Sequence, residues 1–384
     1  MSQALIEQVE EHRKDIKHEV LTYALSELVN MYTADPPEMN IQPEWQRLFR
    51  WSREQQSSFI ESLILEVPIP PLFFFEADNG QWELLDGLQR MSTILKFMGV
   101  TKDVPIEHQG DANNDHEWHY DTQNDVDQPL QLTAPEYLTS LDGLTFARLP
   151  VPLKLNLKRS RIQIYVLKRE THRMYKYEVF KRLNTGGSDL EEQELRNCAV
   201  RILDNQFPDF LREIAKDAAF ASCISVSEED RRQGYADELA LRFFTMKNYG
   251  SNFRHDVGPL LTKFMEAVAL KKVAFDYTKE SDLFRRTFGV IARAFGDGTA
   301  FRGRRRDGAV AGSLSPTLFE LVALAVAGSI DVAESRSPED LRSELIAFAD
   351  SARSEALTGS GSNSKKKTFG RLEKAKTWKP GDVA

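Results

Sequence analysis

Residues 71–95 decide the fold of the N-terminal half, and they read PLFFFEADNGQWELLDGLQRMSTIL. Two short strands are predicted at 71–77 and 81–85, on either side of an Asn-Gly pair. Asn-Gly is a strong hairpin signal, because type I′ turns need positive φ angles. From Leu88 onward, apolar residues recur at helical spacing. The stretch therefore predicts a β-hairpin that leads directly into a helix.

The junction between the second strand and this helix, D-G-L-Q-R at 86–90, is the strongest candidate site. Gly87 permits a sharp turn and a close approach to a ligand, and the N-terminus of a helix favours an anion. Arg90 could grip a phosphate with two donors, while Asp86 could hold a metal ion or orient a water. The alternative is a plain strand-turn-helix, with Asp86 as N-cap and Arg90 as a surface charge. Composition alone favours this alternative.

Two helices are predicted before the hairpin. Apolar residues at helical spacing cover 5–33 and end at Asp35-Pro36-Pro37, so residues 1–37 are expected to form an N-terminal helical segment. The second helix begins at Ser52, which has capping-box spacing with Gln55.

The segment between these two helices is a second candidate site and reads IQPEWQRLFRW (41–51). Gln46-Arg47, together with Arg50 and Trp51, could pair with phosphate and stack a base. The alternative is a hydrophobic staple, in which the aromatic rings are buried and the arginines point outward. The residues alone leave both interpretations open.

Residues 103–130 contain eight acidic residues and no Lys or Arg. This composition predicts a solvated insertion and not part of a core. His108, His116 and His119 lie within it, but their spacing matches no zinc pattern with cysteines.

A third candidate follows a strand predicted at 161–167 and a helix predicted at 172–183. Asn184-Thr185-Gly186-Gly187 is predicted to form a tight turn that could act as a second anion nest. A helix opened by a capping box at Ser188 then runs to about Leu203. For Glu194, Arg196 and Asn197 the alternative is helix capping with a surface ion pair, which contributes less than about 1 kcal/mol.

From about residue 205 the periodicity is helical throughout, with segments predicted at 207–220, 235–248, 257–272, 280–295, 315–328 and 338–350. FRGRRRDG (301–308) is predicted as a basic loop. The fold class is therefore α+β: a small mixed sheet with helices in residues 38–204, followed by an all-helical C-terminal domain over 205–384.

The overall composition limits the possible functions. In 384 residues, 58 acidic and 50 basic side chains give a net charge of -8, so any site for a polyanion must be a local one. Two cysteines exclude a disulfide framework and a four-cysteine zinc site. We expect a cytoplasmic protein without a membrane partner, because no secretory signal is visible and Leu318–Ile330 is too short to cross a bilayer.

Four motifs, in order over roughly residues 38–200, resemble the N-terminal domain family of GmrS/GmrD-type modification-dependent restriction endonucleases. They are IQPEWQRLFRW, FIESLILEVPIPPLFFFE, LLDGLQRMSTI and FKRLNTGGSDLEEQELRN. The resemblance implies a ParB/sulfiredoxin-like fold that binds and hydrolyses a nucleoside triphosphate in bacterial defence against phage DNA. By position it implies a nucleotide site formed by Gln46, Arg47, Asp86, Gly87, Gln89, Arg90, Asn184, Thr185 and Gly186.

Two departures from the family pattern matter. Leu88 stands where sulfiredoxins carry a catalytic cysteine, which excludes thiol chemistry at that position. Restriction members also carry a nuclease module with a metal-binding histidine motif, and none is visible after residue 200. We therefore do not expect this chain to cleave DNA without a separate nuclease or defence subunit.

Two hypotheses follow. In the first, the protein is an Mg²⁺-assisted nucleoside triphosphatase, in which Arg90 holds phosphate, Asp86 binds Mg²⁺, and Asp86 or Gln89 orients the attacking water. In the second, it is a non-catalytic nucleotide- or DNA-binding module whose partner supplies the nuclease, with DNA contacts from basic patches at 158–161, 302–306 and 365–367. A regulatory partner of the toxin-antitoxin kind is a third possibility.

Overall fold

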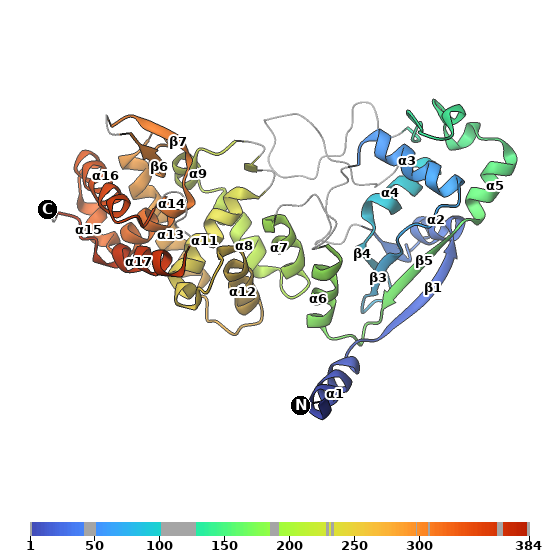
Figure 1. Ribbon diagram of the computed structural model, residues 1–384, viewed down its shortest axis with the longest axis horizontal. Helices are drawn as coiled ribbons and strands as arrows, with labels where there is room; N and C mark the ends of the chain where they lie inside the picture. The colour runs from blue at the N-terminus through green and yellow to red at the C-terminus, as the bar shows by residue number, and fades with distance from the viewer. Residues whose placement is uncertain are drawn as a thin grey trace. The chain divides into compact units, whose positions relative to one another are not determined.

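The computed structural model describes residues 2–41, 51–100, 128–184, 192–227, 230–231, 234–296, 298–305, 308–358 and 364–381. The chain forms two compact units, Met1–Ser188 and Asp189–Ala384 (Figure 1). Each unit is described separately below. The domain limits predicted from the sequence stay predictions.

The first unit is built on a five-stranded mixed sheet with the order β1-β5-β3-β4-β2. The strands are β1 (His18–Ala24), β2 (Met39–Asn40), β3 (Leu72–Glu76), β4 (Trp82–Asp86) and β5 (Arg161–Leu167). β1 pairs antiparallel with β5, β5 parallel with β3, β3 antiparallel with β4, and β4 parallel with β2. The hairpin predicted around Asn79-Gly80 is therefore confirmed as β3–β4.

Helices cover both faces of this sheet. The helices of the unit are α1 (Ser2–Arg13), α2 (Leu25–Thr33), α3 (Arg53–Ile64), α4 (Leu88–Phe97), α5 (Val151–Arg159) and α6 (Arg173–Asn184). Residues from α2, α3, α4 and α5 form one buried cluster with Leu72 and Phe74 of β3. Phe75 points to the opposite face, as alternate strand residues do, and Lys176 of α6 lies 4.4 Å above its ring.

The helix predicted over 5–33 is wrong in its middle part, where the structure has strand β1. All seven residues of β1 pair with β5, and this ladder satisfies the backbone groups of the segment. Leu21 and Tyr23 pack against the core from alternate positions of the strand. The apolar residues of β1 and of the following α2 together have a spacing that resembles that of a single helix, which is why the prediction failed here.

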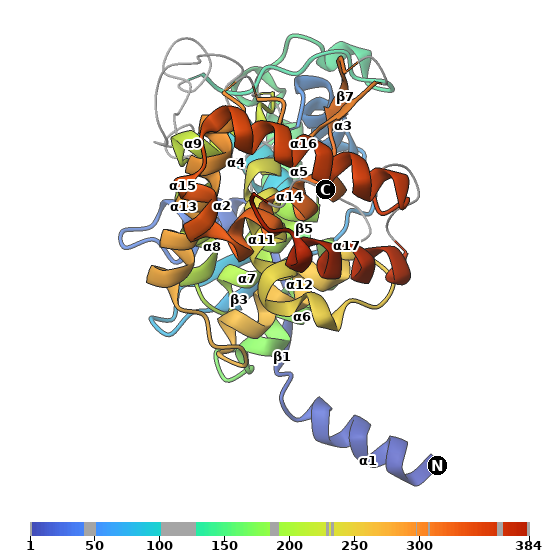
Figure 2. The same cartoon turned by 90° about the vertical axis from the view of Figure 1, so that its left-hand side faces the viewer.

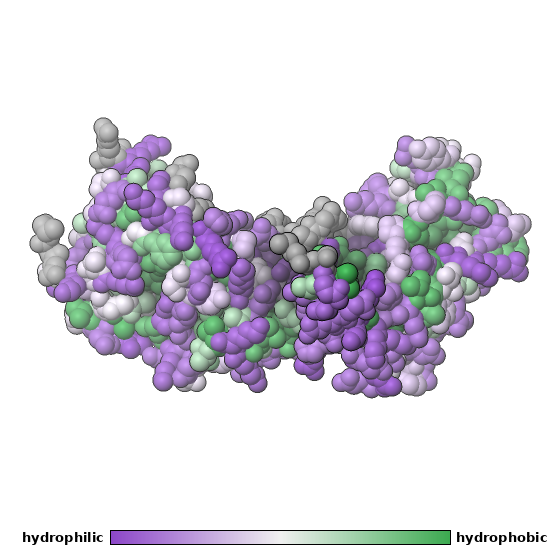
Figure 3. All heavy atoms as spheres, turned by 60° about the horizontal axis from the view of Figure 1, so that its bottom comes forward, coloured by the Kyte–Doolittle hydropathy of each residue, from purple (hydrophilic) through white to green (hydrophobic). Residues whose placement is uncertain are grey.

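Hydrophobic side chains remain exposed at several places in this unit. α1 exposes Leu5, Ile6 and Val9 and extends away from the sheet in Figures 1 and 2. The face drawn in Figure 3 is mostly hydrophilic, with hydrophobic residues in separate patches. Among the described residues, no helix is long and apolar enough to cross a membrane.

The second unit is mostly helical. Its helices are α7 (Glu192–Arg201), α8 (Gln206–Ala215), α9 (Ala218–Ile224), α11 (Tyr235–Tyr249), α12 (Val257–Ala269), α13 (Tyr277–Ala294), α14 (Pro316–Gly328), α15 (Ile330–Ser335), α16 (Pro338–Ser354) and α17 (Lys365–Thr377). α14 is buried along most of its length and contacts α11, α13, α16 and α17 (Figure 2). It forms the centre of the unit.

The prediction that the C-terminal half is wholly helical needs one correction. Part of the predicted basic loop 301–308 is strand β6 (Arg302–Arg304), which pairs antiparallel with β7 (Val310–Leu314). Alternating short residues and arginines with a turn at Gly308, where φ is +83°, suit a hairpin better than an open loop. The fold class, a small mixed sheet followed mostly by helices, is otherwise confirmed.

Candidate functional site at the turn between β4 and α4

The D-G-L-Q-R motif forms the turn from β4 into α4, as predicted. β4 ends at Asp86, α4 begins at Leu88, and Gly87 between them has a left-handed backbone with φ 107° and ψ 19°. A Cβ atom at position 87 would lie 2.3 Å from Cδ2 of Leu72 on β3. Glycine is therefore required twice, by the backbone angle and by the packing of the turn on the sheet.

The guanidinium group of Arg90 is turned inward and holds this turn in place. Its Nη2 lies 2.6 Å from Oδ2 of Asp86, and its Nη1 donates hydrogen bonds to the carbonyls of Pro70 and Pro71, the latter at 2.9 Å. The Arg90 side chain is only 12% exposed. The alternative interpretation, in which Arg90 is a surface charge, is thus wrong. Arg90 instead ties α4 to Pro70 and Pro71, which directly precede β3.

Asp86 does not cap the helix in the way that the alternative interpretation required. The N-cap position is Gly87, and Asp86 instead pairs with Arg90 one helical turn later. Burial lowers the pKa of Arg90, and the charge of Asp86 opposes this shift. A guanidinium group is effectively always protonated in proteins, so Arg90 keeps its charge despite this burial.

Gln89 connects the turn to the segment of the second candidate site. Its Oε1 accepts a hydrogen bond from the backbone N–H of Trp51 at 3.0 Å, and Gln56 donates to the carbonyl of Trp51 at 3.0 Å. The ring of Trp51 packs edge-on against Phe59, with centroids 5.4 Å apart. Trp51 is therefore held by α3 and α4, while Gln46 and Arg47, nearby in sequence, lie outside the described residues.

The third candidate site is described only in part. Asn184 is the last residue of α6, is 6% exposed, and donates a hydrogen bond to the carbonyl of Phe180 at 2.8 Å. Thr185 and Gly186 lie outside the described residues, so their predicted role as an anion nest stays a prediction.

The interpretation of Arg196 as part of a surface ion pair is wrong, because the Arg196 side chain is only 5% exposed. Arg196 on α7 pairs with Glu238 of α11 at 3.1 Å and with Glu192 at 3.2 Å. Asn197 donates to Asp237 of α11 at 3.0 Å. Burial lowers the pKa of Arg196, and Glu238 and Glu192 counteract this shift. The end of the third motif thus packs α7 on α11 in the helical unit.

The geometry of the turn at 86–90 is suited to an anion but leaves few side-chain donors for one. The first N–H groups of a helix have no acceptor within the helix, and those of α4 begin directly after Gly87. Arginine has five N–H groups, and the contacts of Arg90 use three of them. The backbone N–H groups at the start of α4 are therefore the main donors that this turn could offer to an anion.

Asp86 is the residue of the turn that could hold Mg²⁺. Mg²⁺ is usually bound through one or two carboxylates together with substrate phosphates. The carboxylate of Asp86 is 29% exposed, but one of its oxygens already pairs with Arg90. Among the described residues, no group of three or more His, Cys, Asp and Glu could hold a metal. Asp86 thus fits an ion delivered by a nucleotide better than a resident ion.

A basic pocket of about 340 Å³ lies at the other end of α4, and the sequence analysis did not identify it. Lys96, which is 8% exposed, lines it together with Arg53 and Arg148. α4 has ten residues and is about 15 Å long, so this pocket and the turn are separate places. The sequence feature that could have indicated this pocket is Lys96, which lies on the apolar side of a predicted helix.

The residues of the predicted basic patches differ in exposure, and Arg302, Arg304 and Lys367 are half-buried. Lys158, Arg159 and Arg161 are exposed side chains, as are Lys365 and Lys366. The three histidines of the acidic insertion fall outside the described residues.

Residues 25–201 match the model of the GmrSD restriction endonuclease N-terminal domain. The match includes strands β2 to β5, the turn at 86–90 and α7. No curated protein matches the chain.

Proposed function

Since residues 25–201 of this chain belong to the N-terminal domain family of the GmrSD restriction endonucleases, we propose that the protein is a component of a restriction system that acts on DNA. Its N-terminal unit then binds a nucleoside triphosphate at the turn between β4 and α4. The observation that carries this proposal is the left-handed Gly87 at the start of α4, braced by the Asp86–Arg90 ion pair.

In this proposal the triphosphate lies against the first backbone N–H groups of α4. Gly87 supplies the left-handed backbone from which α4 starts, and the partial positive charge of the helix N-terminus favours the phosphates. Arg90 is a positioning residue that fixes the turn through Asp86 and the Pro70–Pro71 carbonyls. Its remaining N–H groups, and the amide of Gln89, are the side-chain donors nearest in sequence to the phosphates.

Other residues of the proposed nucleotide site come from the two neighbouring motifs. Gln46 and Arg47 precede Trp51, whose backbone N–H is bound by Gln89. Asn184 is the last residue of α6, which covers one face of the sheet, and Thr185 and Gly186 come next in the sequence. A ParB/sulfiredoxin-like fold, a cytoplasmic location and a separate nuclease subunit complete the proposal.

Mg²⁺ would be held by the nucleotide phosphates and by the carboxylate of Asp86. When bound, the ion supplies charge neutralisation at the phosphates. Asp86 also orients Arg90, so the same carboxylate links the ion to the shape of the turn.

A second candidate function is nucleotide binding without turnover, in which the ligand sets the conformation of a regulatory module. The structure offers a specific reason for it. Asp86, Gln89 and Arg90, the three proposed catalytic residues, all have their polar groups in contacts with other parts of the chain. Turnover would require at least one of these contacts to be exchanged for a contact with water or phosphate.

One experiment tests binding and turnover together. The full chain is titrated with each nucleoside triphosphate and the corresponding monophosphate, with and without Mg²⁺, and phosphate release is followed with and without DNA. We expect one triphosphate to bind at least tenfold more tightly than its monophosphate, because two more phosphates meet the α4 N-terminus. Phosphate release above the protein-free rate supports the enzyme, and binding without release supports the regulatory module.

Matched variants locate the binding. Gln89→Ala removes a side chain of the motif but retains Gly87, Asp86 and Arg90. Arg159→Ala, on exposed α5, removes a positive charge elsewhere in the same unit. We expect weaker triphosphate binding for Gln89→Ala and unchanged binding for Arg159→Ala. Equal affinities for all three proteins would place the nucleotide elsewhere.

A further inference from the structure

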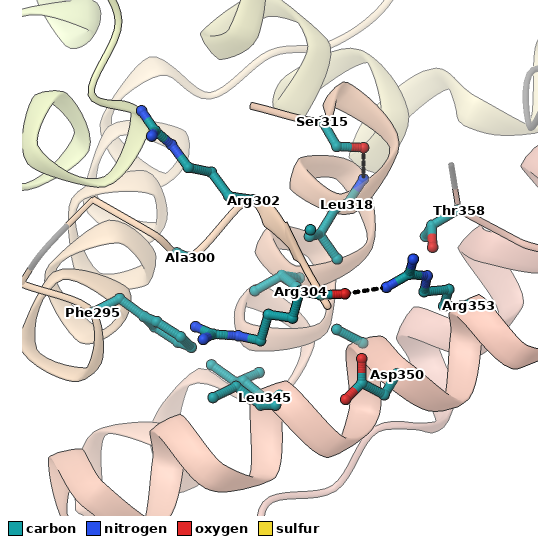
Figure 4. Close-up of a pocket in the computed structure, with 14 residues that line it drawn as sticks. Phe295, Ala300, Arg302, Arg304, Ser315, Leu318, Leu345, Asp350, Arg353 and Thr358 are labelled. Atoms are coloured by element: carbon teal, nitrogen blue, oxygen red, sulfur yellow. Dashed lines mark hydrogen bonds between the residues drawn. The ribbon is translucent and has the colours of Figure 1, made fainter. Parts of the chain in front are cut away.

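The second unit contains a pocket that neither the family match nor the proposed nucleotide site uses. It has a volume of about 170 Å³ and lies between the β6–β7 hairpin, the N-terminus of α14 and helix α16 (Figure 4). Its lining includes the apolar residues Phe295, Leu318, Val322, Leu345 and Ile346. It also includes the charged residues Arg302, Arg304, Arg353 and Asp350.

Arg304 is the residue that points to a ligand. Its guanidinium group extends from β6 into the pocket beside the ring of Phe295 (Figure 4). Nη2 of Arg304 is buried and has no hydrogen-bond partner among the described residues. Nη1 makes a long contact of 3.5 Å with the carbonyl of Gly308. A buried guanidinium N–H without an acceptor is unfavourable, and an anion in the pocket would supply one.

Two further elements make the pocket positive. Arg353 reaches from α16 and donates a hydrogen bond to the backbone carbonyl of Arg304, which holds the strand at the pocket (Figure 4). Ser315 caps the N-terminus of α14, and Ser315 and Leu318 both line the pocket. In Figure 4 the guanidinium group of Arg304 points toward Phe295 and away from that of Arg353. Arg353 thus adds positive charge and fixes the strand, while Arg304 is the residue whose guanidinium group can meet a ligand beside Phe295.

Arg302 is less suited to this role, although it also lines the pocket. In Figure 4 its guanidinium group points away from that of Arg304. It makes a long contact of 3.5 Å with the carbonyl of Ser225. Arg304 is therefore the residue that can bind an anion in this pocket.

We propose that this pocket binds one phosphate ester group of a nucleotide, with the phosphate on Arg304 and the attached sugar against the apolar side chains. The guanidinium group matches phosphate oxygens in charge and in planar geometry. A volume near 170 Å³ is below the 300–1,000 Å³ of pockets for whole drug-sized ligands, so the phosphate and its sugar enter and the base stays outside. The choice of DNA as the source of this nucleotide rests on the proposed function.

The test measures the binding of a fluorescent single-stranded oligodeoxynucleotide to the full chain, with a deoxynucleoside monophosphate and inorganic phosphate as competitors. Arg304→Gln removes the pocket guanidinium. Arg305→Gln is its matched control, because Arg305 is the next residue on the same hairpin but is exposed and does not line the pocket. We expect Arg304→Gln to weaken binding about ten- to a hundredfold and Arg305→Gln to change it less than about twofold.

A third variant keeps the test independent of folding. Asp350→Asn removes the negative charge from the pocket and should strengthen binding about two- to fivefold, which a damaged fold cannot do. Equal losses for Arg304→Gln and Arg305→Gln, or no gain for Asp350→Asn, would overturn the pocket as the site. Competition by inorganic phosphate as strong as that by the monophosphate would overturn a nucleotide as the ligand.

The same variants separate this proposal from the proposed function. Arg304→Gln should bind nucleoside triphosphate as the wild type does, because the turn at 86–90 is unchanged. If the wild type does not bind triphosphate but its affinity for the oligonucleotide depends on Arg304, only the proposed function fails. If the wild type binds triphosphate but its affinity for the oligonucleotide does not depend on Arg304, only the pocket proposal fails.

Discussion

At the scale of single residues, the turn at 86–90 is controlled by a glycine and an ion pair. Gly87 takes a backbone angle that costs other residues free energy, and its missing Cβ makes room for Leu72. Arg90 uses three N–H groups to fix the turn to Asp86 and to the Pro70–Pro71 carbonyls. The candidate nucleotide site is therefore rigid before any ligand arrives.

Gly87→Ala should destabilise the protein more than Gly80→Ala. Both glycines have positive φ angles, +107° and +83°, but a Cβ at Gly80 would meet no atom within 4 Å. Gly80→Ala therefore measures the backbone penalty of about 1 kcal/mol, and Gly87→Ala adds the clash with Leu72, for a total of about 2–4 kcal/mol. Urea denaturation of both variants measures the difference. Equal losses of unfolding free energy for the two variants would show that the Leu72 side chain moves aside without an energetic cost.

The Asp86–Arg90 pair should show a measurable coupling. Asp86→Ala leaves a largely buried guanidinium without its carboxylate and should cost about 1–3 kcal/mol of unfolding free energy. Arg90→Ala should cost a similar amount, and the double variant less than the sum of the two. A double-mutant cycle by urea denaturation measures this coupling. Fully additive losses would mean that the pair does not hold the turn.

At the scale of elements, a chain of ion pairs joins four helices of the second unit. Glu320 on α14 is 2% exposed and binds Arg371 of α17 at 2.8 Å and Arg242 of α11 at 2.8 Å. Arg242 also pairs with Glu238, which binds Arg196 of α7. The charged residues of the third motif therefore position helices, and the buried Glu320 is the centre of this network.

Glu320→Ala should be among the most destabilising single substitutions in the second unit. It removes the buried carboxylate that binds Arg371 and leaves Arg242 with Glu238 as its remaining ion-pair partner, which costs about 3–5 kcal/mol. Glu373→Ala, which breaks the exposed pair with Lys376, should change stability by less than about 0.5 kcal/mol. Thermal or urea denaturation of the two variants compares them. Similar small losses for both would show that water replaces the buried pairs.

Cys223 reports on the packing around α9 and α13. Its thiol is buried, lies 3.6 Å from the carbonyl of Phe288, and has a pKa raised to about 12 by burial. In a Cys198→Ala protein at pH 8, we expect Cys223 to react with a thiol reagent only when the chain unfolds. Because the pKa is raised in the folded state, stability should also fall as the pH rises from about 8.5 to about 12. Rapid labelling of the native protein would contradict this packing.

The elements also show what sequence reasoning can predict. The β3–β4 hairpin and α4 were predictable because an Asn-Gly turn and a helical repeat are local signals. Strand β1 was not, because its partner β5 lies more than a hundred residues later in the chain. The inward orientation of the Arg90 side chain could not be predicted from the sequence either. The sheet brings its acceptors, the carbonyls of Pro70 and Pro71, into reach.

At the scale of the whole molecule, the net charge of -8 determines how DNA can bind. An acidic protein repels a polyanion except where positive charge is concentrated. If the guanidinium group of Arg304 in the pocket of the second unit supplies the main contact, the logarithm of the affinity for single-stranded DNA should fall with the logarithm of salt with a slope of about -1. A titration series over salt concentration measures this slope, and a slope beyond about -5 would indicate an extended basic surface.

The central claim, that a triphosphate binds to the N-terminus of α4, is tested most directly by amide hydrogen exchange of the full, unmodified chain. The account predicts that adding the preferred nucleoside triphosphate with Mg²⁺ slows exchange in peptides that cover residues 86–91, while peptides covering α14 are unchanged. Saturating nucleotide that leaves the exchange of residues 86–91 unaltered would contradict it.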